Sequence, residues 1–455
     1  MDEGPALIPS QAPQKVPLFS LAKGIPLQTN PQEMADYYKN RRLTVWNLTI
    51  IGISNMGWNV AAKVCTALIT LKMLELGLKE DVQGTISSAN SVAVSFLVMV
   101  FSWYSDHTIS RLGRRKPYIF ISAPFIIGSL VIFPFIARPN LIWAIILVQA
   151  IYLLFMDLKQ STFPLLNIDC VPRDMLGRGQ AVFAIADGLV TFFAMSYTDT
   201  VAKYAEWLPY TVCGAIMTVT TIVALLIKEP PVYNPRTESF KPWSTFKVAA
   251  RDKRVFVLFL GVGMVLSYAT MAEQWMWLWA ADSLKINRAD LFDALRWAGL
   301  VNVILAMPLG WIIDRFGSLR VVCVYWALSV ACCAYAMSVH DKNGLLILSL
   351  AHAIVFPMYA AADVMVYKTT DPREIGSITS TNSCLRNFYR GMIVAASTWA
   401  ISSHGSNYRI GFAMGIVMMT VGVAMFFIHR RLMGKPEAIP VGDAAVPELQ
   451  AVADH

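Results

Sequence analysis

Long apolar segments are the feature that most constrains how this chain can fold. A helix that crosses a membrane needs about 20 mostly apolar residues. Twelve segments of this kind occur in the 455 residues, at approximately 43–70, 82–105, 117–137, 140–168, 179–203, 207–228, 255–281, 291–313, 319–340, 344–367, 374–402 and 407–431. Apolar residues make up 56% of the chain and charged residues 15%, so a soluble body of this size would expose large apolar patches. The pattern excludes a soluble enzyme, a disordered chain and a nucleic-acid-binding protein, and predicts an all-α integral membrane protein with twelve transmembrane helices.

One polar stretch divides the segments into two sets of six. Residues 229–254 are charged and contain adjacent prolines near their start, whereas the other connections are short. We therefore expect one six-helix bundle over 43–228 and a second over 255–431, joined by this linker, with polar tails at 1–42 and 432–455. The N-terminal tail lacks the apolar centre of a cleavable signal peptide, so the first segment is expected to remain in the mature protein.

Lysine and arginine are distributed unevenly over the connections. The tails and the connections on their side hold about three times as many of these residues as the opposite side. Because basic loops remain in the cytoplasm, both termini are expected to be cytoplasmic, in a multi-pass protein of the plasma or inner membrane. Topology then explains the net charge of +8 without an acidic partner.

A short motif recurs after the second segment of each half. It comprises Asp106, Arg111, Gly113, Arg114 and Arg115 in the first half, and Gly310, Asp314, Arg315, Gly317 and Arg320 in the second. In both copies an aspartate ends the helix, a glycine permits a tight turn and basic residues follow. The repetition predicts two pseudo-symmetric bundles. Each aspartate can bind the start of a neighbouring helix or an arginine, as a breakable cytoplasmic gate; a helix stop with inside-positive charge is the simpler alternative.

The second copy of this motif resembles the loop signature of the major facilitator superfamily, G-x-x-x-D-R-x-G-x-x-R. The first copy departs from it, with Ser102 in place of the first glycine. Its longer form, R-x-G-R-R-K-P, is similar to the glycoside–pentoside–hexuronide:cation symporters and the plant-type sucrose–proton symporters. Residues 155–181 also look like that group, with Asp157, Asp169 and the run Gly177-Arg178-Gly179-Gln180-Ala181. The resemblance implies the major facilitator fold, transport by alternating access and proton-coupled symport of a sugar, with Asp157 as the protonated residue.

Asp157 also stands out from its position alone, because it lies well inside the segment 140–168. A charge in the membrane interior is costly and marks a candidate functional residue. Gln160 and Ser161 follow at helical spacing on the same face, so they are candidate contacts for a solute. We predict that Asp157 loads and releases a proton; a permanent pair with a cation is the alternative.

Two further ionisable residues lie at similar depths in neighbouring segments. Lys159 points away from the face of Asp157, because two residues turn a helix by about 200°. Asp187 lies in the next segment, 179–203. We predict a buried structural pair between Lys159 and Asp187, rather than direct contact of either with a solute.

Arg386 and Arg390 share one face of the segment 374–402, near its middle. Guanidinium groups can donate hydrogen bonds to sugar hydroxyls, bind a carboxylate, or pair with Asp157 across the two halves. A pair with Asp363 in the preceding segment is the structural alternative. Both arginines are therefore candidate solute-binding or gating residues.

Two aromatic patches could form walls of a cavity. Asn55, Trp58 and Asn59 share a face of the first segment, where hydrogen bonding between helices is the alternative. Glu273 and Trp275 lie in the seventh segment in a tryptophan-rich run. A ring can stack on a sugar and a carboxylate can bind its hydroxyls, but tryptophans at this depth also anchor helices at the membrane interface.

Taken together, these residues predict a secondary active transporter and not an enzyme. The chain has no phosphate-binding loop of the type that ATP-driven pumps use and no spacing of metal ligands. We expect no cofactor, a proton (with Na⁺ as the alternative) as coupling ion, a sugar or glycoside as solute, the lipid bilayer as surroundings, no nucleic acid, and a monomer. The alternatives are a transporter of an organic anion or drug-like solute, and a membrane sensor that binds a solute without moving it.

Overall fold

The computed structural model describes residues 20–21, 36–78, 80–110, 112–172, 175–230, 253–266, 275–369 and 375–433. Its elements are β1 (Ser20–Leu21), α2 (Arg41–Val60), η1 (Ala61–Cys65), α3 (Thr66–Glu75), α4 (Glu80–His107), β2 (Thr108–Ile109), α5 (Lys116–Ile136), η2 (Pro139–Leu141), α6 (Ile142–Cys170), α7 (Leu176–Tyr204), α8 (Leu208–Val223), η4 (Ala224–Leu226), α10 (Lys253–Val265), η5 (Trp279–Ser283), α12 (Arg288–Phe316), α13 (Ser318–Ala336), α14 (Lys342–Val355), η6 (Phe356–Tyr359), α15 (Ala360–Thr369), α16 (Ile375–Ser403) and α17 (Arg409–Met433). The two short strands pair antiparallel, with Ser20 opposite Ile109.

The helices coincide with the apolar segments expected from the sequence. Continuous helices satisfy their own backbone hydrogen bonds, as lipid surroundings require. Local signals set several of their starts: α5 and α8 have a proline in the first turn, where no N–H donor is needed. Asn40 and Asn287 cap α2 and α12 through their side-chain oxygens. The seventh segment is described in part, by α10 and η5.

Irregular turns occur in the first segment of each half. The π-helical turn η1 separates α2 from α3, and a second π-helical turn, η5, lies at the end of the seventh segment. In η1 the Tyr152 hydroxyl of α6 donates a hydrogen bond to the Ala61 carbonyl at 2.8 Å. A further break, the 3₁₀ turn η6, has a proline near its start and separates α14 from α15. Such turns are frequent at functional sites.

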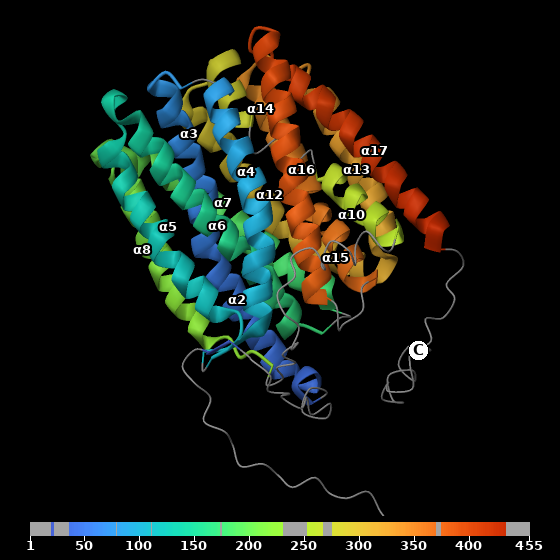
Figure 1. Cartoon of the computed structure of the whole chain (residues 1–455). Coiled ribbons are helices and arrows are strands. Elements are labelled where there is room, and N and C mark those ends of the chain that lie inside the picture. The colour runs from blue at the N-terminus through green and yellow to red at the C-terminus, as the bar shows by residue number, and fades with distance from the viewer. Residues whose placement is uncertain are drawn as a thin grey trace, which may run out of the picture.

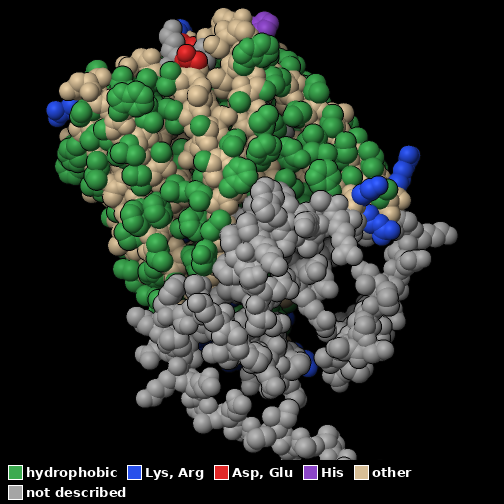
Figure 2. Space-filling model, in the orientation of Figure 1, with side chains coloured by type: hydrophobic (Ala, Val, Ile, Leu, Met, Phe, Trp, Pro, Cys, Tyr) green, Lys and Arg blue, Asp and Glu red, His purple; other side chains and the backbone are tan. Residues whose placement is uncertain are grey.

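The outer surface of the helices is apolar. Eight helices within the described residues are long and apolar enough to cross a membrane. The number of twelve spans stays a prediction from the sequence. Trp143 and Val219 expose 84% and 61% of their surface. Figure 2 shows hydrophobic side chains over the side of the molecule, with the visible charged groups near the ends of the helices.

The helices of the two halves lie side by side. Figure 1 shows the blue-to-green helices α2 to α8 beside the yellow-to-red helices α10 to α17. We call the end at which α2 begins and α17 ends the terminal face, and the opposite end, where α3 ends and α4 begins, the far face.

Helices α7 and α12 form the first seam between the halves, and glycines bring their backbones into contact. A Cβ atom on Gly188 would lie 2.7 Å from the Gly299 carbonyl oxygen, and one on Gly310 would lie 2.8 Å from the Gly177 carbonyl oxygen. The two contacts are 11 residues apart on each helix, so the seam runs for about 16 Å from the terminal face inward. Only glycine permits backbones to approach this closely.

Helices α4 and α16 form the second seam, towards the far face. The Ser88 hydroxyl donates a hydrogen bond to the Gly391 carbonyl at 2.8 Å. Nearer the far face, a Cβ atom on Gly84 would collide with the side chain of Thr398. The halves therefore touch at both ends, α7–α12 on the terminal side and α4–α16 on the far side.

Candidate functional site

Asp157 lies on α6 of the first half and faces charged groups of the second half. Asn90 of α4 lies near its carboxylate. The guanidinium groups of Arg390 and Arg386 on α16 act on its charge, Arg390 more strongly. The structure thus brings Asp157 of one segment near two arginines of another, across the boundary between the bundles.

Arg386 lies between two carboxylates. Its Nη1 atom is 3.5 Å from Oδ2 of Asp363, a buried residue in the first turn of α15, directly after the break at η6. The two partners that the sequence offered for this arginine, Asp157 and Asp363, are therefore both near it. Removing one member of such a network leaves an uncompensated charge in a low-dielectric interior, which is costly.

A polar and aromatic face of α2 carries donors without partners. Asn55 and Asn59 are buried and Trp58 is half-buried. Neither the indole N–H of Trp58 nor the amide nitrogen of Asn59 has an acceptor among the described residues. A buried donor without an acceptor costs about 1–3 kcal/mol, so these groups are suited to bind water or the hydroxyl groups of a solute.

The predicted Lys159–Asp187 pair is wrong. Oδ2 of Asp187 lies 3.6 Å from the amino group of Lys63, whereas the amino group of Lys159 lies 5.6 Å from the ring centre of Phe163. The physical reason is helix adjacency: α6 packs on α4 and α5, whereas α7 packs on α2 and α12. The consecutive helices α6 and α7 therefore do not pack closely on each other.

Lys63 is a functional candidate that the sequence analysis missed. It sits in the π-helical turn η1, and its charge also acts on His352 of α14 in the other half. The side chains of Lys63 and Asp187 keep 31% and 14% of their surface exposed, so they border open space. The sequence did show one ionisable residue in each of two apolar segments, Lys63 in the first and Asp187 in the fifth. That these two residues pair with each other could be seen only in the folded structure.

The remaining candidates for solute contact fall into two groups. Trp275 is fully buried, donates a hydrogen bond to the Ser397 hydroxyl at 3.0 Å and packs near the ring of Tyr408, so the structure places it in a packed contact rather than on a cavity wall. Gln160 is half-buried on α6. Glu273 and the side chain of Ser161 lie outside the described residues.

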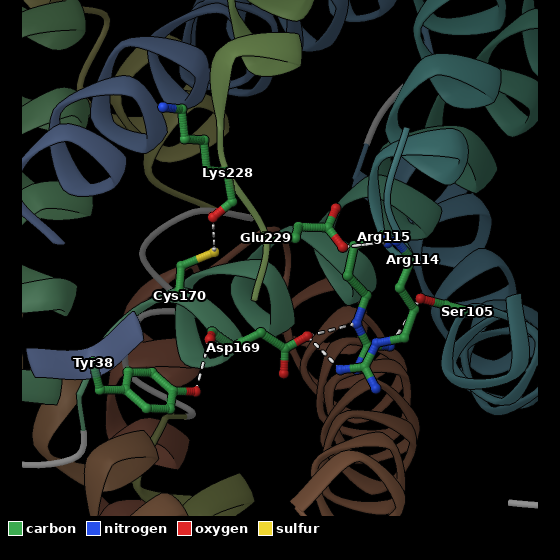
Figure 3. A network of polar contacts seen from close by, with 8 residues as sticks. All are labelled: Tyr38, Ser105, Arg114, Arg115, Asp169, Cys170, Lys228 and Glu229. Carbon is green, nitrogen blue, oxygen red and sulfur yellow. Dashed lines mark hydrogen bonds and ion pairs between the residues drawn. The ribbon is translucent and has the colours of Figure 1, made fainter. Parts of the chain in front are cut away.

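The basic residues of the first motif copy bind the end of α6 and the start of the linker, as Figure 3 shows. Arg114 and Arg115 approach the Asp169 carboxylate at 2.5 and 3.2 Å, and Arg115 also donates to the Ser105 hydroxyl. Glu229 accepts a hydrogen bond from the Arg114 backbone N–H at 2.7 Å. The sequence analysis had assigned no role to Asp169 in this motif, nor any to Glu229.

A glycine makes this docking possible. Gly113 has φ +115°, and a Cβ atom there would lie 2.4 Å from the Glu229 carboxylate. Burial raises the pKa of Glu229 against the lowering effect of the Arg114 N–H and nearby cations. The side chain of Asp106 and all of Arg111 lie outside the described residues.

The aspartate of the second copy spans the two halves. The Asp314 carboxylate accepts hydrogen bonds from the backbone N–H groups of Gly177 and Arg178 at 2.9 and 3.2 Å, at the start of α7. The Arg178 side chain approaches the same carboxylate at 3.4 Å. A carboxylate at a helix N-terminus satisfies N–H groups that have no partner within the helix and interacts favourably with the helix dipole. This contact closes the terminal end of the α7–α12 seam.

The other residues of the second copy shape the turn. Gly317 has φ +86° and separates α12 from α13. The Arg315 guanidinium lies 4.9 Å from the ring centre of Trp311, and Arg320 is exposed. Within the described residues, no group of three or more His, Cys, Asp or Glu side chains is placed to hold a metal ion.

Apolar helices in two bundles, with charges facing one another across their boundary, define a membrane transporter of small solutes. Residues 48–388 match the family model of the Major Facilitator Superfamily, and the chain belongs to this superfamily. It is therefore a multi-pass membrane protein of a transporter family rather than of an enzyme family.

A solved structure shares this architecture. The crystal structure of the human organic anion transporter MFSD10 (TETRAN) matches with a TM-score of 0.62 at 15% sequence identity, covering 85% of this chain and 99% of that one. At this identity the likeness shows the fold alone. Among curated protein sequences, none matches.

Proposed function

We propose that the protein is a proton-coupled secondary transporter that moves a polar organic solute by alternating access through twelve membrane-spanning helices. The observation that carries the proposal is the arrangement of Asp157 in one bundle against Arg390 and Arg386 in the other. When Asp157 is ionised, its attraction to the guanidinium groups holds the bundles together. Protonation removes that attraction, so the charge state of one residue biases which end can open.

The favoured solute is a sugar or glycoside. Trp58 offers a ring and an N–H donor, and Asn59 and Asn55 offer amides, on one face of α2. This is the combination that binds the apolar face and the hydroxyl groups of a sugar. The similarity of residues 155–181 to sucrose–proton symporters points the same way.

An organic anion is the second candidate solute, supported by a separate observation. In this version the carboxylate of the solute replaces that of Asp157 beside Arg390 once Asp157 is protonated. The structural neighbour described as an organic anion transporter is consistent with that version. Both versions require that the proton and the solute each change the affinity for the other.

The terminal face is proposed to be cytoplasmic, with both chain termini on that side, because the excess of lysine and arginine lies there. The contacts of Asp314 with α7, and of Arg114 and Arg115 with Asp169, then act as cytoplasmic gates. They close when the carboxylate and its donors meet and break when the bundles rotate apart.

Uptake into proteoliposomes tests the proposal. Sugars and organic acids are supplied in parallel, with and without an inward proton gradient and with Na⁺ as a separate arm. The proton gradient is expected to drive accumulation by the wild type, and Asp157→Asn is expected to remove the dependence on that gradient. Asp293→Asn is the matched control, because Asp293 pairs with Arg296 at the exposed far end of α12.

Three outcomes would contradict the proposal. Uptake indifferent to the proton gradient, or unaltered in Asp157→Asn, would remove proton coupling. Accumulation driven by Na⁺ alone would change the coupling ion. Binding of a solute to the purified protein without any flux would instead support a membrane sensor.

A further inference from the structure

A groove of about 440 Å³ lies within the first bundle, and no charged residue lines it. Val60 of α2 forms part of its floor, Phe193 and Ala194 of α7 line one wall, and Val212 and Ile216 of α8 line the other. Phe193, Val212 and Ile216 are exposed on the outer surface of the bundle. The groove therefore opens sideways to the surroundings of the helices.

The groove ends near the far face at a second, charged cavity. This cavity has a volume of about 240 Å³ and shares Pro209 with the groove. Its charged residues are two lysines and two glutamates, Lys72, Glu75, Lys203 and Glu206. The Lys72 amino group lies 3.2 Å from a carboxylate oxygen of each glutamate.

Aromatic residues place this cavity at the edge of the bilayer. Tyr204, the last residue of α7, and Trp207, directly before α8, are exposed and adjoin the cavity residues Lys203 and Glu206 in the sequence. Exposed tyrosine and tryptophan side chains at helix ends mark the level of the lipid headgroups. The charged cavity thus lies at headgroup level, and the apolar groove extends from it to the level of the acyl chains.

We propose that a phospholipid of the leaflet at the far face binds here, with one acyl chain in the groove and a zwitterionic headgroup in the charged cavity. The phosphate lies beside Lys72 and Lys203, and the ammonium group lies beside Glu75 and Glu206. Two positive and two negative side chains balance, which favours a zwitterion over an anionic headgroup.

The charges, rather than the groove alone, give the site its selectivity. Leaving the bulk lipid for an apolar groove provides no hydrophobic driving force, because lipid tails are as apolar as the groove. Shape and headgroup contacts must therefore supply the preference. The proposal is independent of the transported solute and of Asp157.

Native mass spectrometry of the full chain in detergent tests the site. Phosphatidylethanolamine, phosphatidylcholine and phosphatidylglycerol are added separately, and retained lipid is measured for wild type, Ala194→Trp and Val212→Trp. The two tryptophans fill the groove, and Val212 is exposed, so its variant should fold even if Ala194→Trp does not. Leu147→Trp is the control, because Leu147 is an exposed residue of α6 outside the groove.

The wild type and Leu147→Trp are expected to retain one zwitterionic lipid about tenfold better than phosphatidylglycerol, which corresponds to about 1.4 kcal/mol. Val212→Trp should lose that retention, and Lys72→Gln with Glu206→Gln should lose the headgroup preference but keep the chain. Equal retention by Val212→Trp and Leu147→Trp would overturn the groove assignment. A preference for phosphatidylglycerol in the wild type would overturn the headgroup assignment.

Discussion

Replacement of Gly188 by alanine tests whether the α7–α12 seam controls opening of the terminal face. The added Cβ atom would lie 2.7 Å from both the Gly299 carbonyl oxygen and a methyl group of Val303. Ordinary contact begins at 3.4 Å, so the two helices must separate by about 0.7 Å. The carbonyl belongs to the backbone of α12 and cannot move on its own.

The expected magnitude follows from the overpacking that the added methyl group causes in the closed seam. Overpacking of a tight contact costs about 1–3 kcal/mol. Exchanging glycine for alanine within a helix contributes about 0.5–1 kcal/mol in favour of the folded chain, but it does so whether the seam is open or closed. The gain therefore cancels, and the closed seam should lose about 1–3 kcal/mol relative to the open one, which shifts their ratio by about 5- to 160-fold.

Thiol labelling measures that ratio. Asn302 is buried on α12 in the seam and donates a hydrogen bond to the Ala184 carbonyl of α7 at 3.3 Å. A cysteine introduced at Asn302 should react with a membrane-impermeant reagent only when the seam opens. The labelling rate is corrected for the rate of the same protein without the introduced cysteine. Gly188→Ala is expected to raise the rate by the factor above.

The control is a glycine with space around it. On α5, no atom of the described residues beyond the helix's own backbone lies within 4 Å of a Cβ placed on Gly128. Gly128→Ala should leave the labelling rate unchanged. Equal rates in the Gly188 and Gly128 variants would refute the idea that backbone contact at this seam holds the terminal face closed.

Three further predictions concern charged contacts. Lys63→Met or Asp187→Asn alone should destabilise the protein by about 1–3 kcal/mol, and the double variant should recover part of this in thermal unfolding; simple additivity would contradict the pair. Because the pKa of Glu229 is raised by burial, the folded chain binds its proton more tightly than the unfolded chain. Its contribution to stability is therefore lost as pH rises from about 4.5 through the raised value, and Glu229→Gln should lack this loss when melting temperatures are compared over that range. Asp314→Asn should weaken the closed seam by about 1 kcal/mol and raise the labelling rate, whereas an unchanged rate would show that the contact does not act as a gate.

Local patterns along the chain were enough to place its helices. Runs of about 20 apolar residues need internal hydrogen bonding in lipid, so the positions of most described helices followed from the pattern of these runs. The repeated motif indicated the superfamily, which the family match over residues 48–388 confirms. The proton-coupling role of Asp157 and the nature of the solute stay predictions.

Which charged side chains on different helices pair with each other could not be predicted from the sequence. Lys159 and Asp187 were matched by depth and by order in the chain, yet Asp187 meets Lys63 instead. Helices in lipid associate through close packing of their surfaces rather than through hydrophobic burial, so glycines such as those of the α7–α12 seam decide which helices touch.

The sequence by itself therefore predicted which parts of the chain form apolar helices and which ionisable residues lie within those segments. Only the tertiary structure decided which of these residues face each other. Hydrogen bonding within a helix and transfer to lipid depend on local composition, whereas the distance between two side chains on different helices depends on contacts among residues far apart in the chain.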